Sequence, residues 1–238
     1  MYVVCYWFIM FIIYSFIGWI IDVCDIYYKY KKIVNRGFLI GPYCPIYGVG
    51  VLLIIFLLKD YTNNVLVLFV LATVLCMVLE YLTSYVMEKW FNARWWDYSD
   101  RKFNLNGRIC LETTIPFGLG AMLVMYVVNP FLVGVLNKMP NNVIIIIGII
   151  LMVIFLVDWI ISFSIISKIN DIDWSKFKDD TEEINKRVLE YLKGTSPQMR
   201  RLIESFPNVR LRVKELKAKF DHKRKKITKK IKEKMNRD

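Results

Sequence analysis

Three acidic residues interrupt long apolar runs of this sequence: Asp22, Glu80 and Asp158. An ionised group at the centre of a bilayer costs about 2.5–3.5 kcal/mol on insertion scales, so such residues usually mark ion or substrate pathways. A fourth acid, Glu112, stands just before another apolar run. If the runs are helices ordered as argued below, these four carboxylates converge in one half of a bundle. The alternative is that they are structural pairs that fix helix packing, or are protonated.

The cations that could compensate these acids lie in the polar loops, at Arg36, Arg94 and Arg108. The sequence gives little indication of a metal site. The five cysteines are scattered without a CxxC pair, and the single histidine, His222, lies in the basic C-terminal part. No His/Cys cluster has the spacing of a zinc site, so we expect no metal site and no cofactor, and we assign no catalytic residue.

One short segment combines a cation, an anion and stacking faces: Arg94, Trp95, Trp96, Asp97 and Tyr98. Such a set could hold a lipid head group or close a gate. The simpler interpretation is an interfacial belt, because Trp and Tyr concentrate where apolar and polar surroundings meet.

A second segment, GFLIGPYCPIYGVG (residues 37–50), contains four glycines and two prolines. Both residue types break helices, and irregular backbone at membrane depth persists only when it is buried in protein or lines a wet cavity. We therefore predict a broken or re-entrant segment near 37–50. An ordinary interfacial loop before a short span is the alternative.

The elements that must position these residues are predicted by composition. The 238 residues are 56% hydrophobic, above the roughly 45–50% of soluble domains. Residues 1–168 carry 12 Lys+Arg and 9 Asp+Glu, whereas residues 169–238 carry 21 and 12. An apolar body with a separate basic tail excludes a single soluble domain, a secreted disulfide scaffold and a disordered protein. It predicts an all-α polytopic membrane protein with transmembrane helices near 3–26, 44–58, 65–88, 115–136 and 143–167.

The positive charges predict the orientation of these five spans. Lys and Arg cluster after the first and third spans and in the C-terminal tail, while the connections KDYTNN and NKMPNN carry one lysine each, Lys59 and Lys138. All basic regions fall on the inner side only if the N-terminus is outside and the C-terminus inside. The two outer connections are short, so spans two and three, and spans four and five, are predicted to be antiparallel neighbours.

The domains expected are a transmembrane domain (1–168), a cytoplasmic linker (169–208) and a basic amphipathic helix (209–238). Residues 210–238 carry 14 Lys+Arg against 4 Asp+Glu, and apolar residues recur at three- and four-residue steps. Such a helix could lie on the anionic inner leaflet as a lipid-binding surface. It could instead form the coiled-coil seam of a homodimer. Nucleic acid is an unlikely partner, because no recognition motif accompanies the charge.

Several motifs resemble a known family of bacterial membrane proteins. They are YSFIGWIID (14–22), NRGFLIGPYCPIYG (35–48), LEYLTSYVMEKWF (79–91), RWWDYS (94–99) and FNLNGRICLE (103–112). In this order they resemble the family described as "putative ABC-transporter type IV". Where that family usually has Glu after Gly-Trp, this chain has Asp22, and where it often has Ser and Trp before the fourth span, this chain has Thr114 and Phe117. The resemblance implies a multi-span protein of the bacterial cytoplasmic membrane, grouped with permeases.

These observations predict a membrane-embedded, permease-like subunit of a bacterial transport system, with an inward-facing polar cavity. Glu80, Asp158 and Asp22 would line it, with Arg36 and Arg94 in charge compensation. The sequence has no GxxxxGK[ST] segment, so any ATPase would be a separate subunit. The alternatives are a membrane enzyme acting on a lipid or polyprenyl substrate, with the acids as acid/base groups or metal ligands, and a non-catalytic scaffold.

Overall fold

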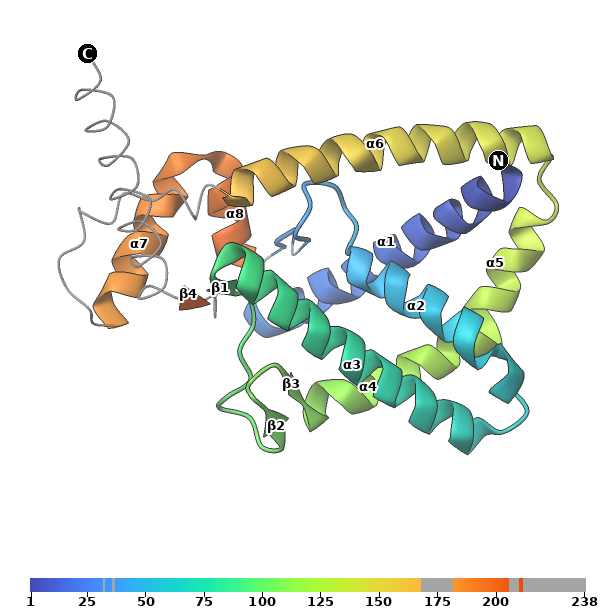
Figure 1. Cartoon of the computed structure of the whole chain (residues 1–238), viewed down its shortest axis with the longest axis horizontal. Helices are drawn as coiled ribbons and strands as arrows, with labels where there is room; N and C mark the ends of the chain where they lie inside the picture. Colours follow the sequence, from blue (N-terminus) through green and yellow to red (C-terminus); the bar gives the residue numbers. More distant parts are fainter. Residues whose placement is uncertain (32, 36, 168–181, 206–209, 212–238) are drawn as a thin grey trace, which may run out of the picture.

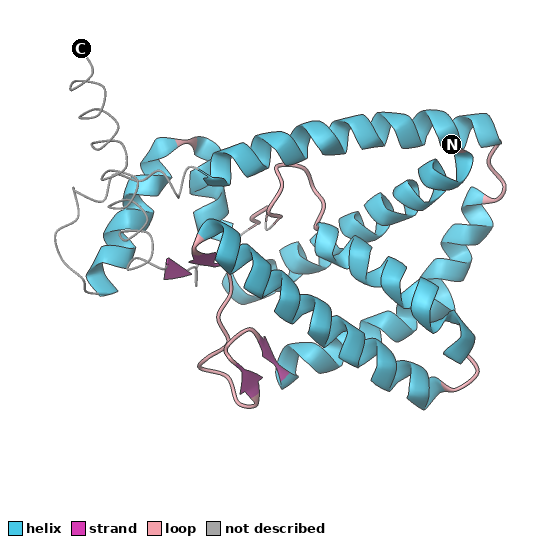
Figure 2. Cartoon of the chain, in the orientation of Figure 1, coloured by secondary structure: helices cyan, strands magenta, loops and turns pink. Residues whose placement is uncertain are grey.

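The computed structural model describes residues 1–31, 33–35, 37–167, 182–205 and 210–211, and these are predominantly helical (Figure 2). The helices are α1 (Tyr2–Tyr30), α2 (Pro45–Leu58), α3 (Val65–Phe91), α4 (Leu111–Leu123), α5 (Asn129–Leu136), α6 (Asn141–Ser167), α7 (Glu182–Thr195) and α8 (Pro197–Ser205). A 3₁₀ turn (Lys59–Tyr61) follows α2, and a π-helical turn (Val124–Val128) joins α4 to α5. Short strands pair antiparallel: β1 (Ala93–Arg94) with β4 (Arg210–Leu211), and β2 (Asn104–Leu105) with β3 (Ile109–Cys110).

Local sequence explains where several helices begin and bend. The Asn64 side chain accepts a hydrogen bond of 3.1 Å from the backbone N–H of Val67 and so caps the start of α3. Pro45 stands at the start of α2, where its missing N–H is not needed. Pro130 lies at the start of α5, directly after the π-helical turn. A proline removes one helical hydrogen bond, which accounts for the irregular turn before it.

Helices α1, α3 and α6 run in the same direction, and α2 and α4–α5 return (Figure 1). The ring of Phe8 in α1 lies 5.7 Å from that of Phe155 in α6, and Phe91 at the end of α3 lies 5.4 Å from Phe163 near the end of α6. We call the end of the bundle where α1, α3 and α6 finish the polar end. It holds the loop after α1, residues 92–110 and helices α7 and α8.

Among the described residues, four helices are long and apolar enough to cross a membrane: Tyr2–Tyr28, Val65–Phe91, Leu111–Leu136 and Asn141–Ser167. The prediction of a helical multi-pass membrane protein is therefore confirmed. The predicted second span is the exception among the five, because α2 has only 14 residues. A helix of that length is about 21 Å long, against about 30 Å for the hydrocarbon core.

The irregular part of the predicted broken segment lies before α2, not within it. Residues 37–44 are non-helical, and Gly37, Leu39, Tyr43 and Cys44 are buried. The last two glycines of the segment, Gly48 and Gly50, lie inside α2. A Cβ atom at Gly48 would come within 2.3 Å of the Ser15 hydroxyl, so this glycine lets α2 approach α1 closely.

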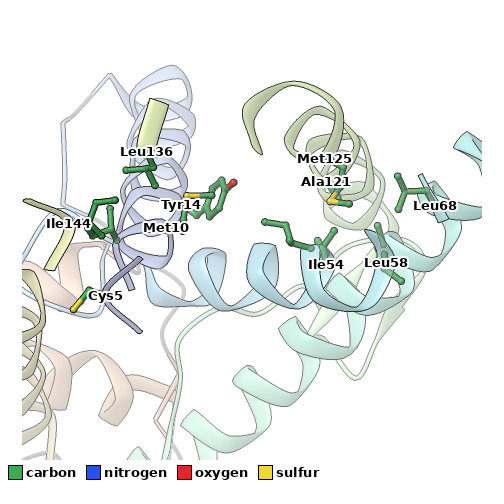
Figure 3. Close-up of a cluster of buried hydrophobic side chains, with 13 residues drawn as sticks. Cys5, Met10, Tyr14, Ile54, Leu58, Leu68, Ala121, Met125, Leu136 and Ile144 are labelled. Carbon is green, nitrogen blue, oxygen red and sulfur yellow. The ribbon is translucent and has the colours of Figure 1, made fainter. Parts of the chain in front are cut away.

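The membrane helices share an apolar core that includes Cys5, Met10, Ile54, Leu68 and Ile144 (Figure 3). As expected from the short connection, α2 packs against α3. The fourth and fifth spans were expected to pack against each other. In the structure, α6 packs mainly along α1, whereas α4 packs mainly against α3. Gly148 explains the first of these contacts, since a Cβ there would lie 2.4 Å from Cβ of Cys5.

Helices α7 and α8 form a hairpin that packs on the polar end (Figure 1). Their buried residues, among them Leu192, Met199 and Leu202, share an apolar cluster with Phe91 and Ile166 at the ends of α3 and α6. This part of the segment interpreted as a linker is thus packed helix. Of the predicted amphipathic helix 209–238, only residues 210–211 are described, and they form strand β4; the remainder lies outside the described residues.

Candidate functional site

Two of the predicted carboxylates, Asp22 on α1 and Glu80 on α3, lie near enough for their charges to interact. The hydroxyl of Tyr47 donates a hydrogen bond of 2.7 Å to Oδ1 of Asp22, and the thiol of Cys44 lies 3.7 Å from Oδ2. Tyr98 donates a hydrogen bond to Glu80. We call Asp22 and Glu80, with these three neighbours, the carboxylate pair site.

Glu80 is buried, with 7% of its surface exposed, and its Oε2 atom has no hydrogen-bond partner among the described residues. Buried polar atoms are nearly always hydrogen-bonded, so an orphaned carboxylate oxygen needs an explanation. A bound proton, a cation or a water molecule would each satisfy it. The pair site can therefore accept a hydrogen-bond donor or a cation that the described residues do not provide.

Gly18 allows the pair site to form. A Cβ atom at this position would lie 2.2 Å from Cγ of Tyr47, so the Tyr47 ring lies directly on the backbone of α1. Asp22 follows one helical turn later on the same face. The glycine thus brings the Tyr47 hydroxyl within reach of the Asp22 carboxylate.

Asp158 lies elsewhere and is fully engaged. Its carboxylate accepts hydrogen bonds from the backbone N–H groups of Ile40 (3.0 Å) and Gly41 (2.7 Å), and from the hydroxyls of Tyr43 and Ser162. Donors to an ionised carboxylate form strong, short hydrogen bonds. Asp158 therefore anchors the 37–44 loop to α6. Figure 1 shows this loop extending toward α6.

The start of this loop, at Gly37, and Asn35 just before it are also held by α1 and α8. The indole N–H of Trp19 donates to the Asn35 side chain at 2.7 Å, and the Ser205 hydroxyl donates to the Asn35 carbonyl at 2.7 Å. Arg201 donates to the carbonyls of Asn35 and Gly37. Burial lowers the pKa of the Arg201 guanidinium, and the negative charge of Asp158 counteracts this effect.

The arginines Arg94 and Arg108 pair with Glu88, a residue that sequence reasoning did not single out. Oε2 of Glu88 lies 3.0 Å from Nε of Arg94 and 2.8 Å from Nη2 of Arg108. The chain turns after α3 at Asn92, which ends this helix with a φ of 51°. Asn tolerates this left-handed conformation well, and it directs the chain back so that Arg94 meets the last turns of α3.

The guanidinium of Arg108 is also held by aromatic rings. It lies 5.6 Å from the centroid of the Tyr81 ring and 5.5 Å from that of Tyr85, and it donates to the Ser84 hydroxyl at 3.1 Å. Arg108 and Glu88 are both buried. This saturated cluster fixes residues 92–110 against α3.

The residues of the 94–98 segment separate in the structure. Trp95 is 2% exposed and belongs to the apolar cluster under α7 and α8, so it is a core residue. Trp96 donates to the Arg108 carbonyl at 3.1 Å, and Asp97 accepts from the backbone N–H and hydroxyl of Ser99. Of this segment, Tyr98 is the residue that reaches the carboxylate pair site.

The remaining two predicted residues do not join these groups. Glu112 is exposed and forms a surface ion pair with Arg101 at 3.0 Å. Arg36 lies outside the described residues. The expected convergence of four carboxylates is thus found for Asp22 and Glu80, whereas Asp158 binds the loop and Glu112 lies on the surface.

Sequence reasoning missed Glu88, Tyr43 and Tyr47. The signal for Glu88 was present, because it directly precedes a loop rich in Arg and lies two turns after Glu80 on α3. The two tyrosines lie in the Gly/Pro segment, where polar aromatic side chains beside glycines indicate close contact of a ring with the backbone. Neither signal identifies the partner that each residue binds.

A helical bundle with four spanning-length helices and buried carboxylates defines this chain as a multi-pass membrane protein. The model of the family described as "Putative ABC-transporter type IV" matches residues 9–163, and the chain belongs to this family. The match includes the carboxylate pair site, Asp158 and the Glu88 cluster. No curated protein and no solved structure matches the chain.

Proposed function

We propose that this chain is the membrane-embedded, permease-like subunit of a bacterial transport system, and that the carboxylate pair site binds the proton that gates it. The observation that supports this proposal is the buried Glu80, whose Oε2 atom has no partner among the described residues and whose carboxylate lies within range of the charge of Asp22. Two apposed carboxylates in apolar surroundings hold a proton more readily than either does alone. The inward-facing polar cavity would open to this pair from the polar end.

The proposed topology places the N-terminus outside and the polar end on the cytoplasmic side of the bacterial inner membrane. The parallel course of α1 and α3 supports it, because residues 31–64 must then return across the bundle (Figure 1). In this arrangement the 37–44 loop and α2 together form a fifth, broken crossing. Irregular backbone at that depth is tolerated because the loop is buried among α1, α6 and α8.

Energy would come from a partner, since the sequence has no phosphate-binding GxxxxGK[ST] segment. We propose a separate ATPase subunit that docks at the polar end. The family description supports a place in such a system.

The alternative of a lipid-phosphate enzyme is less well supported. It assigns the phosphate to the arginines predicted to accompany the acids, but of these Arg94 and Arg108 are both paired with Glu88. Within the described ranges, moreover, no group of three or more His, Cys, Asp or Glu residues gathers closely enough to hold a metal ion.

Proton movement through proteoliposomes tests the proposal directly. The purified full chain is reconstituted with a pH-sensitive dye inside the vesicles, and the internal pH is followed after an outside pH jump. We expect protein-dependent proton uptake that Glu80→Gln abolishes, while Glu112→Gln, which alters a surface acid, leaves it unchanged. A wild-type chain that moves no protons, or a Glu80→Gln chain that moves them at the wild-type rate, contradicts the proposal.

A further inference from the structure

A groove of about 580 Å³ lies at the polar end, away from the carboxylate pair site. One wall is residues 33–35, which follow α1, and the other is the turn between α7 and α8 with the first part of α8. Small-molecule sites usually have volumes of about 300–1,000 Å³, so the groove can take a compact ligand.

Three cationic side chains line this groove, Lys193, Arg200 and Arg201, against a single carboxylate, Glu204. Nε of Arg200 donates to the Lys193 carbonyl at 3.3 Å, which keeps these two residues side by side. The ion pairs among the described residues involve Arg94, Arg101 and Arg108, and none of the three groove cations. Within the described part of the chain, these cations therefore form no direct ion pair, although the negative charge of Asp158 acts on Arg201.

Arg201 adds a donor that still needs an acceptor. Its Nη1 binds the Asn35 and Gly37 carbonyls, but its Nε is buried without a hydrogen-bond partner among the described residues. A buried guanidinium N–H without an acceptor is costly, so an acceptor on a ligand would stabilise it. The guanidinium is thus fixed by the 33–37 segment at the wall of the groove.

The backbone at the groove also favours an anion. The Ser196 hydroxyl accepts from the N–H of Met199 at 3.1 Å and so caps α8, a helix of nine residues that begins at the groove. Helix N-termini carry partial positive charge and bind phosphate groups. Gly194 lies beside them, and a Cβ at this position would meet no atom within 4 Å. Space for a ligand therefore exists next to the cations.

We propose that this groove binds a phosphate group, either the head group of an anionic phospholipid or free phosphate. Arginine and lysine recognise phosphate by charge-assisted hydrogen bonds, and basic pockets beside spanning helices commonly hold lipid head groups. The groove adjoins the end of α1, and Ile33 on its wall is 81% exposed, which suits a lipid chain next to the head group.

Calorimetric titration of the detergent-purified full chain tests this with two soluble probes, dioctanoyl phosphatidylglycerol and inorganic phosphate. Two groove variants are compared with wild type: the double substitution Lys193→Gln/Arg200→Gln, and Gly194→Asp, which adds a negative charge where there is open space. Lys138→Gln, an exposed cation in the α5–α6 connection, is the matched control. Arg201 is left intact because it also holds the 33–37 segment.

We expect both groove variants to weaken binding by about tenfold or more, because each removes or opposes a charge-assisted hydrogen bond, while the control binds as wild type does. Binding of the lipid probe alone identifies a head-group site, and equally strong binding of inorganic phosphate identifies a free-phosphate site. The proposal is overturned if wild type binds neither probe, or if both groove variants bind as tightly as wild type. These outcomes do not depend on proton movement at Glu80.

Discussion

Asp158 and Glu80 are both buried carboxylates in long apolar helices, yet their surroundings differ. Asp158 accepts hydrogen bonds from two backbone N–H groups and two hydroxyls, which bind the 37–44 loop to α6. Glu80 interacts with the charge of a second carboxylate and keeps an oxygen without a partner among the described residues. The difference indicates that a buried acid with all its acceptors used holds the fold, whereas one with an unused acceptor is available for binding.

Glu88, like Asp158, is a buried acid that holds the fold. Its substitution should have the largest effect on the free energy of unfolding. Glu88→Gln removes the anion that Arg94 and Arg108 share, and leaves the buried Arg108 without an ion-pair partner among the described residues, whereas Arg94 keeps Asp97 at 3.8 Å. Breaking a buried ion pair by removing one partner costs about 3–5 kcal/mol, so we expect a loss of that size in the free energy of unfolding. Denaturation of the purified protein in mixed micelles measures it, and a loss below about 1 kcal/mol, the range of surface pairs, would contradict this assignment.

The next largest effect should come from Asp158→Asn. The amide has one acceptor oxygen, so either the Ile40 N–H or the Gly41 N–H would face an N–H group instead of an acceptor. A buried donor left without an acceptor costs about 1–3 kcal/mol, and we expect a loss in that range. Protease cleavage within 37–44 should increase in parallel, because the loop loses its anchor. An unchanged cleavage rate would mean that Trp19 and Ser205 hold the loop without Asp158.

Gly18→Ala should have an intermediate effect that reaches the carboxylate pair site. The added Cβ would lie 2.2 Å from Cγ of Tyr47, so the ring must leave α1 and its hydroxyl must leave Asp22. Overpacking of this kind costs about 1–3 kcal/mol in the free energy of unfolding. Gly120→Ala is the matched control inside α4, because its Cβ would meet nothing within 4 Å, and it should lose no stability, since alanine favours a helix more than glycine does. Equal stability of the two variants would show that α1 and α2 are not in close contact at Gly18.

Glu80→Gln should change stability least, although we expect it to abolish proton movement. The substitution removes the electrostatic repulsion from Asp22 and keeps an oxygen that can accept from the Tyr98 hydroxyl. It adds an amide N–H donor, for which the neighbouring Asp22 carboxylate can serve as acceptor. Polar interactions inside membrane bundles average about 0.6 kcal/mol, so the free energy of unfolding should stay within about 1 kcal/mol of wild type. A large loss of stability would place Glu80 with Asp158 among the structural acids, and the comparison would fail.

Sequence reasoning predicted much of the architecture. The apolar runs were long enough to predict spanning helices, because a bilayer requires about 20 apolar residues per helix, and four of the five are found at spanning length. The clustered glycines and prolines of residues 37–50 predicted a break, and residues 37–44 are non-helical. Family membership could also be predicted, because it rests on residue types in a fixed order.

The sequence alone determined that this protein is a helical membrane protein with rare acids in apolar helices. Composition and hydrophobic periodicity are properties of residues that are neighbours along the chain, so they can be read without the fold. Only the tertiary structure decided which acid meets which partner. Tyr43 and Asp158 are 115 residues apart, and Arg201 binds the carbonyl of Asn35 from 166 residues away. Such pairings depend on which helix faces meet and where the loops fold back, and a pattern of residues along one chain does not specify the rotation of one helix against another. For that reason Asp158 is a loop anchor and Glu80 an open site, although both look alike in the sequence.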